Sequence, residues 1–420
     1  MTEEFLHYIW RYGLYRQKSL STSEGFDVTV IKAGWLNRDS GPDFLNARIR
    51  IGKAEWIGHV EIHLKASDWY QHQHQHDPHY DQVILHVVYQ LDKAVYTTGG
   101  SIIPAIELEV DECYFDTYMA MVNNISPIPC GSAWKSIPTI HVETALVAMG
   151  VNRLQSKIES MSAGLEENRG GWKNLSLRVL FRGFGFGKNH ENFEILARSI
   201  DHQILEKNLE NLFQLECLLF GQAGMIPEQN PDPYALAISK EYAYMREKYH
   251  LKKPTDYNWN RKRTRPGNQP AVRIAQLAAW LYNRHDYFEL LLSPGSQSSG
   301  LNFDATISSY WSRHIDFGRK AKKPNTSIGH IANGLLQINV VLPFTAFYRQ
   351  QHGEEEAIRD WLEQLEQIPP EDNSILRNWK EAGFRIPNAF YSQTFLYLYK
   401  EFCVNRRCLQ CSLGRLTIRE

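Results

Sequence analysis

The spacing of apolar residues changes along the chain, from a short helical stretch to alternating strands. Residues 5–14 repeat apolar side chains such as Phe5, Ile9 and Trp10 at helical spacing. Apolar and polar residues then alternate with the period of two that strands have. The predicted strands cover 26–37, 44–51, 54–65, 81–90 and 101–110, with a turn at Gly52–Lys53. Residues 1 to about 115 therefore predict one helix followed by a mixed sheet.

From about residue 139 the apolar spacing is that of helices and stays so. Amphipathic stretches cover 141–161, 192–220, 270–292 and 354–368, and clusters of Pro, Gly and Asn separate them. The glycines of "GFGFGKN" (183–189) lack the spacing of a phosphate-binding loop, so they predict a helix-breaking turn.

These patterns predict an α+β protein in which a mixed-sheet domain precedes a large α-helical domain. We place the sheet domain at 1–124, a proline-containing linker at 125–139 and the helical domain at 140–400. A cysteine-containing tail, 401–420, follows. A chain of 420 residues exceeds one average core, which agrees with more than one domain.

Composition narrows the classes of partner. The formal net charge is −1, so a polyanion would have to be bound by local basic patches. The most apolar stretch, 328–348, contains His330, Asn339 and Pro343 and predicts a buried helix, so we expect no membrane span. The N-terminus lacks the pattern of a secretory signal, and six cysteines are too few for a disulfide framework. We therefore expect a cytoplasmic protein.

Two carboxylates on neighbouring strands form the first candidate site. Asp43 follows Pro42 at the start of one predicted strand, and Glu61 lies inside the next. A hairpin can bring two such carboxylates side by side, and a divalent cation relieves their repulsion. His63 and Lys65 share the face of Glu61 because strand side chains alternate. We predict a Mg²⁺ or Mn²⁺ site at Asp43 and Glu61, with His63 or Lys65 acting on a bound water or phosphate.

This order of elements resembles the PD-(D/E)XK nuclease superfamily. The matching pieces are Pro42-Asp43 and the triplet Glu61-Ile62-His63, within residues 1–90. The resemblance implies a restriction-endonuclease-like sheet and metal-dependent phosphodiester cleavage, with an acid of the first helix, Glu3 or Glu4, joining the site. The sequence departs from the pattern at His63, where the superfamily has lysine.

A second resemblance covers nearly the whole chain. The stretches that carry it are "GPDFLNARIRIG", "VEIHLKASDW", "YDQVILHVVY", "GFGFGKN" and "RCLQC". With them the chain resembles an uncharacterised bacterial family, a domain of unknown function. That resemblance supports the domain arrangement and implies no activity.

Histidines are dense in the stretch "YQHQHQHDPHYD" (70–81). His72, His74 and His76 alternate, so in an extended segment they would share a face and bind Zn²⁺ or Ni²⁺ through imidazole. Two other interpretations are a polar loop with incidental histidines and a proton shuttle in which one histidine works with Asp77.

The C-terminal tail spaces Cys403, Cys408 and Cys411 as C-x4-C-x2-C. The Cys408–Cys411 pair fits a zinc knuckle, with Cys130 or a histidine as fourth ligand. The same spacing occurs in iron–sulfur ligation. Buried thiols and a redox pair are the other interpretations.

Two basic runs in the helical region predict an anion-binding surface. The first holds Arg261, Lys262, Arg263 and Arg265, and the second holds Arg319, Lys320, Lys322 and Lys323. Tyr257 and Trp259 precede the first run, while Trp311 and Phe317 precede the second, a composition that suits phosphate neutralisation with base stacking. The alternative is a pair of solvated loops.

Together these features favour a metal-dependent phosphodiesterase or nuclease that acts on nucleic acid. The sheet domain would supply the chemistry and the helical domain the grip. The alternative is a non-catalytic nucleic-acid-binding or scaffold protein with a nuclease-like sheet and a structural metal. The absence of lysine at position 63 favours this alternative.

Overall fold

The structure is a computed structural model, and it describes residues 1–16, 19–131, 133–167, 171–229, 231–262, 264–282, 284–292, 301–324 and 328–419. The chain folds into two compact units. The first comprises Met1–Met149, Arg377–Phe384 and Phe395–Glu420, and the second comprises Gly150–Leu376 and Arg385–Thr394. The C-terminal end of the chain therefore packs in the same unit as the N-terminal sheet. The predicted domain boundaries at 124, 139 and 400 stay predictions beside this division.

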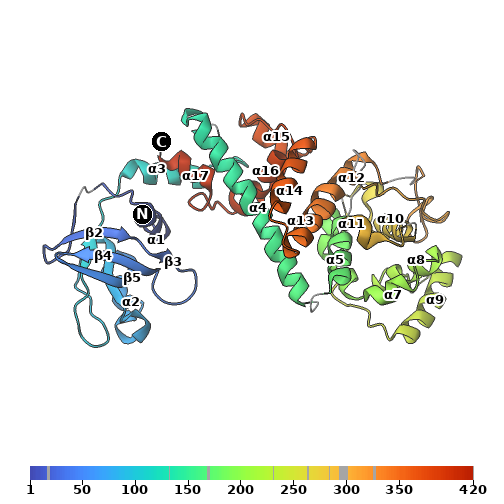
Figure 1. Ribbon diagram of the computed structural model, residues 1–420, viewed down its shortest axis with the longest axis horizontal. Helices are drawn as coiled ribbons and strands as arrows, with labels where there is room; N and C mark the ends of the chain where they lie inside the picture. The colour runs from blue at the N-terminus through green and yellow to red at the C-terminus, as the bar shows by residue number, and fades with distance from the viewer. Residues whose placement is uncertain are drawn as a thin grey trace. The chain divides into compact units, whose positions relative to one another are not determined.

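A mixed sheet forms the centre of the first unit (Figure 1). Its seven described strands run in the order β1-β2-β4-β5-β6-β7, with β3 paired to β4. Strands β2, β4 and β5 are antiparallel neighbours, whereas β5, β6 and β7 are parallel. The strands are β1 (Leu20–Ser21), β2 (Asp27–Lys32), β3 (Trp35–Leu36), β4 (Phe44–Ile51), β5 (Ala54–Lys65), β6 (Val83–Gln90) and β7 (Ala105–Glu107).

The β4–β5 pairing contains a bulge close to Asp43. Asn46 has a φ of 55°, in the left-handed region, and the register shifts between Phe44 and Ala47. Bulges bend a strand and redirect the side chains beside them, often next to functional sites. This bulge changes the direction of the chain where Asp43 enters the sheet.

A glycine makes room for the parallel strand β6. A Cβ on Gly58 would lie 2.4 Å from Cγ2 of Ile84 and 2.7 Å from the backbone oxygen of Gln82. Any larger residue would push β6 away. The β5–β6 register shifts next to this point, between His59 and Val60, and then places Glu61 opposite His86.

Helix α1 (Glu3–Tyr12) packs beside β5. The Thr2 side chain caps its N-terminus by accepting from the N–H of Phe5, and Gly13 ends it in the left-handed conformation. Its apolar face, which includes Phe5, Leu6 and Ile9, is fully buried. Shorter elements complete the unit: α2 (Asp68–Gln71), the 3₁₀ turns η1 (His74–His76), η2 (Pro78–Tyr80) and η3 (Ala133–Ser136), α3 (Glu112–Val122), the π-helix η6 (Tyr399–Cys403) and α17 (Ser412–Arg419).

The second unit is helical, as Figure 1 shows for the segments coloured green to orange. Its largest core cluster encloses Trp280 and Trp311, both fully buried. The other described elements are α4 (Thr139–Glu167), α5 (Trp172–Phe184), α6 (Phe186–Arg198), α7 (His202–Glu206), α8 (Leu212–Gln222), α9 (Pro233–Tyr249), η4 (Pro266–Asn268), α10 (Pro270–Tyr282), α11 (Tyr287–Leu292), β8 (His314–Asp316), β9 (Arg319–Lys320), α12 (His330–Leu336), the π-helix η5 (Gln337–Val341), α13 (Leu342–Gln351), α14 (Ala357–Gln367), α15 (Ser374–Glu381) and α16 (Ala389–Leu398). The chain passes from one unit to the other within α4, within α15, after Phe384 and within α16.

One helical run, His330–Gln351, has the length and composition to cross a bilayer, and 56% of its most apolar window is buried inside the structure. Its buried residues include Leu336, Val340 and Phe344, which belong to the largest core cluster. The helix break predicted in "GFGFGKN" falls at Gly185 alone, because α5 ends at Phe184 and α6 begins at Phe186, and the other residues of the stretch are helical. The predicted fold class is confirmed: an N-terminal mixed sheet with a first helix precedes a mostly helical region, so the protein is α+β.

The close packing of α8 on α9 gives a stability prediction. A Cβ on Gly221 would lie 2.1 Å from the ring of the buried Tyr242, so Gly221→Ala should lower the free energy of unfolding by about 1–3 kcal/mol through overpacking. The matched control is Gly187→Ala in α6, where an added Cβ meets nothing within 4 Å. Urea denaturation followed by circular dichroism measures both. Equal stability of the two variants would contradict this packing.

Candidate functional site

Asp43 and Glu61 lie next to each other and are held by reciprocal hydrogen bonds. The backbone N–H of Asp43 donates to Oε2 of Glu61 at 3.0 Å, and the N–H of Ile62 donates to Oδ2 of Asp43 at 3.0 Å. Each carboxylate therefore accepts from the backbone of the other strand. Glu61 is buried, with 5% of its surface exposed, while Asp43 is half-buried. The structure thus brings together the two carboxylates that the hairpin argument paired.

Helix α1 adds two groups to this carboxylate pair. Nε2 of His7 lies 3.1 Å from Oδ2 of Asp43. Although burial opposes it, the hydrogen bond and charge of Asp43 raise the pKa of His7 above its ordinary value. Burial raises the pKa of Glu3, whose carboxyl also interacts with His72, Asp43 and His7. Glu4 instead accepts a hydrogen bond from Gln410, so Glu3 is the acid of α1 that lies by the site.

His63 is at the centre of a chain of three imidazoles. Its Nδ1 lies 2.9 Å from Nε2 of His86, and its Nε2 lies 3.1 Å from Nδ1 of His72. His63 and His86 are buried, with 1% and 0% of their surface exposed, whereas His72 is exposed. The chain therefore runs from inside the sheet to solvent.

The histidine-rich stretch is folded into short turns, not extended. Helix α2, the turns η1 and η2, and Gln73 with a φ of 62° replace the expected alternation, so the prediction of one face shared by His72, His74 and His76 is wrong. His74 turns inward and stacks on the ring of Tyr80 at 3.7 Å between centroids. His76 is exposed. Because the side chains of His74 and Tyr80 are buried, the stretch folds over the site.

Four side chains meet at a spacing that suits a metal ion. We call His63, His72, His74 and Glu61 the histidine cluster. Oε1 of Glu61 lies 3.5 Å from Nε2 of His63 and 3.4 Å from Nε2 of His74. Ligand atoms of the three histidines all lie within 4.8 Å of one another. Ligands about 2.0–2.1 Å from a tetrahedral zinc ion are about 3.3 Å apart, which is close to these separations.

A buried nitrogen of the cluster supports the same assignment. Nε2 of His74 lies 3.4 Å from Oε1 of Glu61 and has no hydrogen-bond partner. If Nε2 of His63 is a metal ligand, its ring proton is on Nδ1 and is donated to His86, the second-shell arrangement that orients ligand histidines. A cation at the cluster would also give Nε2 of His74 a partner.

The electrostatics of the cluster favour neutral histidines. Burial and the neighbouring imidazoles lower the pKa of His63 to about 2, and burial lowers that of His86 to about 3. Burial also lowers the pKa of His74. Burial together with the charge of Asp43 raises the pKa of Glu61 to about 9. A cation would reverse this last effect by stabilising the carboxylate.

Lys65 lies at the end of β5 with its side chain exposed. Hydrogen bonds from Ser67 lower the pKa of Asp92, and the positive charge of Lys65 adds to this effect, so Lys65 interacts with Asp92. Its catalytic role stays a prediction.

The two basic runs meet in the second unit. Arg261 forms an ion pair with Asp316 of β8 at 3.2 Å, and β9, which contains Arg319 and Lys320, pairs with β8. Lys262, Arg265, Lys320 and Lys322 are exposed, whereas Arg263 lies outside the described residues. We call Lys262, Arg265, Lys320 and Lys322 the basic patch.

The aromatic residues near these runs differ in exposure. Trp311 is fully buried, so it cannot stack on a base. Trp259, Tyr257 and Phe317 are half-buried and pack against the core, and the indole of Trp259 donates to the backbone oxygen of Ala223. Base stacking by these three rings stays a prediction.

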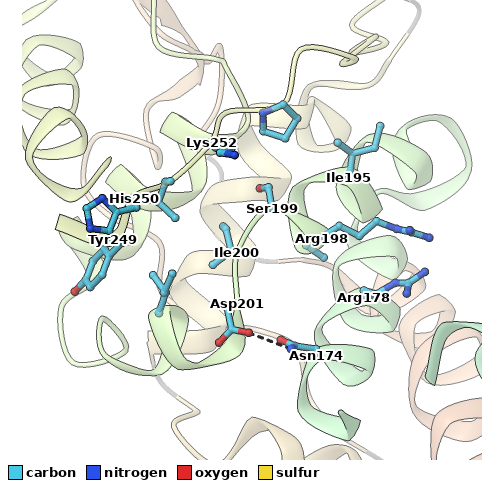
Figure 2. A pocket seen from close by; sticks show the side chains of 14 residues that line it. Asn174, Arg178, Ile195, Arg198, Ser199, Ile200, Asp201, Tyr249, His250 and Lys252 are labelled. Atoms are coloured by element: carbon cyan, nitrogen blue, oxygen red, sulfur yellow. Dashed lines mark hydrogen bonds between the residues drawn. The ribbon is translucent and has the colours of Figure 1, made fainter. Parts of the chain in front are cut away.

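The second unit also contains a cavity of about 630 Å³, shown in Figure 2. Several of its charged side chains are already paired. Arg178 binds Glu167 and Glu194, and Asp201 accepts from Asn174 and from the N–H of Gln203. Lys252 is exposed at this cavity. The histidine cluster, whose ligand atoms converge on one point, is the stronger candidate site.

The sequence prediction missed His7, His74 as a partner of Glu61, and His86. A signal for His86 is present, since it interrupts the apolar run "VILHVV". His7 follows Glu3 by four residues on the same helical face, which is a signal only once Asp43 is known to lie beside α1.

Comparisons with known proteins identify a family but no activity. The family model described as "Protein of unknown function (DUF2851)" matches residues 3–374. No curated protein and no solved structure matches the chain.

The lowered pKa values predict acid destabilisation of metal-free protein. Unfolding returns the pKa of His63 and His86 from about 2 and 3 to the ordinary 6.5, so the unfolded chain binds more protons and stability falls as pH drops below 6.5. The raised pKa of Glu61 has the opposite effect, since it increases stability as the pH falls from about 9 to 4.5. Glu61 is a single group, whereas two histidines reduce stability at low pH. Urea denaturation in chelator from pH 7 to pH 4 should show this loss.

In that titration His86→Gln should reduce the pH dependence, because one titrating group is removed. His76→Gln is the control, since His76 is an exposed histidine of the same stretch. A pH dependence that His86→Gln leaves unchanged would contradict the buried neutral pair.

Proposed function

The chain belongs to that family of unknown function, and we propose that it is a metal-dependent phosphodiesterase acting on nucleic acid. The observation that carries the proposal is the meeting of Glu61 with three imidazoles beside the hydrogen-bonded Asp43. Buried carboxylates and neutral imidazoles at ligand spacing suit a divalent transition metal. The order α1, Asp43 before β4, hairpin, then Glu61-Ile62-His63 on β5 adds the support of the PD-(D/E)XK resemblance.

The ligand set favours Mn²⁺ over Mg²⁺. Imidazole is a poor ligand for Mg²⁺, which prefers oxygen and waters. Four protein ligands would close a tetrahedral zinc site, whereas a six-coordinate ion keeps two positions for water and a phosphate oxygen. Such an ion polarises the phosphoryl oxygen and lowers the pKa of bound water.

His7 and Asp43 are the proposed proton-transfer pair. Asp43 orients the imidazole of His7 through the 3.1 Å contact, and its charge favours the protonated ring. His7 keeps 22% of its side chain exposed, so a substrate can reach it. A protonated His7 can donate to the leaving oxygen of a phosphodiester.

His63 stands where the PD-(D/E)XK pattern has lysine, and this separates the proposal from its alternative. As a metal ligand, His63 cannot act as the cation that binds the scissile phosphate. In a catalytic protein that charge would come from the metal and from protonated His7. In a binding or scaffold protein the site would hold metal and bind nucleic acid without cleaving it.

Cleavage assays with the full-length protein test the proposal. We expect nucleic acid to be cleaved with Mn²⁺, and Glu61→Gln to reduce the rate more than about 100-fold because a ligand is removed. His7→Gln should reduce it about 100-fold at unchanged metal affinity, as expected for a general acid. His76→Gln is the control and should keep full activity. Equal activity of wild type and Glu61→Gln would identify a contaminant, and metal-dependent binding without cleavage would favour the alternative.

We propose that the basic patch of the second unit binds the nucleic acid. Replacing Lys262, Arg265, Lys320 and Lys322 by Ala should weaken duplex binding, because fewer phosphates are neutralised and fewer counterions are released. The slope of log affinity against log salt should fall by about 3–4, since each neutralised phosphate contributes about 0.9 to it. Fluorescence anisotropy between 50 and 200 mM salt measures both.

A control for the grip removes four exposed cations elsewhere in the second unit: Lys240, Arg246, Lys248 and Arg359. It changes net charge equally and should leave the slope nearly unchanged. Equal effects of the two quadruple variants would assign the weaker binding to net charge alone.

A further inference from the structure

Four cysteines of the first unit surround one small cavity. Cys130 follows α3, Cys403 is the last residue of η6, and Cys408 and Cys411 lie between η6 and α17. All four are free thiols and buried, with 5–8% of their surface exposed. All four line a cavity of about 20 Å³. Sequence spacing alone pointed to three of them, and the fold supplies the fourth from a distant part of the chain.

The local backbone folds tightly around Cys408 and Cys411. Arg406 has a φ of 54°, and the N–H of Cys408 donates to its backbone oxygen at 2.8 Å. A Cβ on Gly414 would lie 2.4 Å from the backbone oxygen of Cys408, so the turn closes only with glycine there. Burial raises the pKa of Cys411, although its sulfur accepts from the backbone N–H groups of Gly414 and Leu413, which oppose that rise. A bound cation would stabilise the thiolate.

A separate contact holds the Cys130 segment against this turn. Nη1 of Arg406 donates to the backbone oxygen of Ser126 at 3.1 Å. Asn124 supports the same segment by donating to the backbone oxygen of Pro129 at 2.9 Å. The guanidinium of Arg406 also brings positive charge close to Cys403 and Cys408. The fourth cysteine is therefore fixed in place by polar contacts that do not involve sulfur.

We propose that Cys130, Cys403, Cys408 and Cys411 form a structural site for a single zinc ion. Four cysteines are the ligand set of a closed tetrahedral zinc site. The cavity has room for about one water-sized ion, since about 10–15 Å³ holds one, and is too small for an iron–sulfur cluster. Among the described residues, His63, His72 and His74 form the group whose ligand atoms all lie within 4.8 Å of one another. The four sulfurs do not meet that limit, so they must move inward to bind one zinc ion.

This site is independent of the proposed activity and has a structural consequence. The family model matches residues 3–374, so three of the four ligands lie beyond the matched part. The ion would tie the segment after α3 to the one before α17, in the unit that contains the histidine cluster. Binding energy of a structural zinc site adds to folding free energy.

Metal analysis and cobalt spectroscopy of the full-length protein test the site. To separate it from the histidine cluster, all variants carry His72→Ala and His74→Ala. Protein purified without chelator should contain one zinc per chain, and Co²⁺ exchange should give thiolate-to-metal charge-transfer absorption. Cys130→Ser and Cys408→Ser should lose the zinc and the charge-transfer band and unfold at lower temperature. Cys113→Ser, at an exposed thiol, should keep all three properties, and Cys217→Ser, buried in α8, should keep the zinc and the charge-transfer band.

If Cys130→Ser does not fold, titration of the parent protein with an organomercurial replaces it, and one zinc should be released as four thiols react. Iron with acid-labile sulfide in place of zinc would overturn the single-ion assignment. Absence of both metals, or zinc retained by Cys130→Ser, would overturn the site.

Discussion

The site of this protein depends on two hydrogen bonds that cross between neighbouring strands. Asp43 and Glu61 each accept an N–H from the strand of the other, which fixes two acids side by side at the edge where β4 leaves the sheet. Like charges at such a place repel, and burial raises the cost. When no cation is bound, burial and the charge of Asp43 raise the pKa of Glu61, which reflects the cost of keeping its carboxylate charged. In the proposed metal site, the imidazoles around Glu61 are the remaining ligands.

Two irregularities of the backbone lie close to Asp43 and Glu61. The Asn46 bulge and the close approach at Gly58 both break regular pairing within a few residues of the two acids.

The sequence was informative where side-chain position follows from a fixed period. Alternation placed Glu61 and His63 on one face of β5, and the hairpin brought Asp43 to them. It failed where direction is set by turns. Gln73 in the left-handed conformation sends His74 inward and His76 outward, and no spacing rule predicts that. His7 reaches its cluster through tertiary packing, which sequence distance does not reveal. The ring of Trp311 was assigned to ligand stacking because burial in a helical core cannot be seen from neighbouring charges.

The first unit is built from both ends of the chain, and this has a consequence for its synthesis. The hydroxyl of Tyr8 donates to the backbone oxygen of Arg415, a contact between residues 407 positions apart. At about 5–20 residues per second a ribosome needs roughly 20–80 s to make that interval. For that time the first unit lacks its C-terminal segments, Arg377–Phe384 and Phe395–Glu420. The part of the chain that is translated first therefore belongs to a unit that is completed only when the last segment has been made.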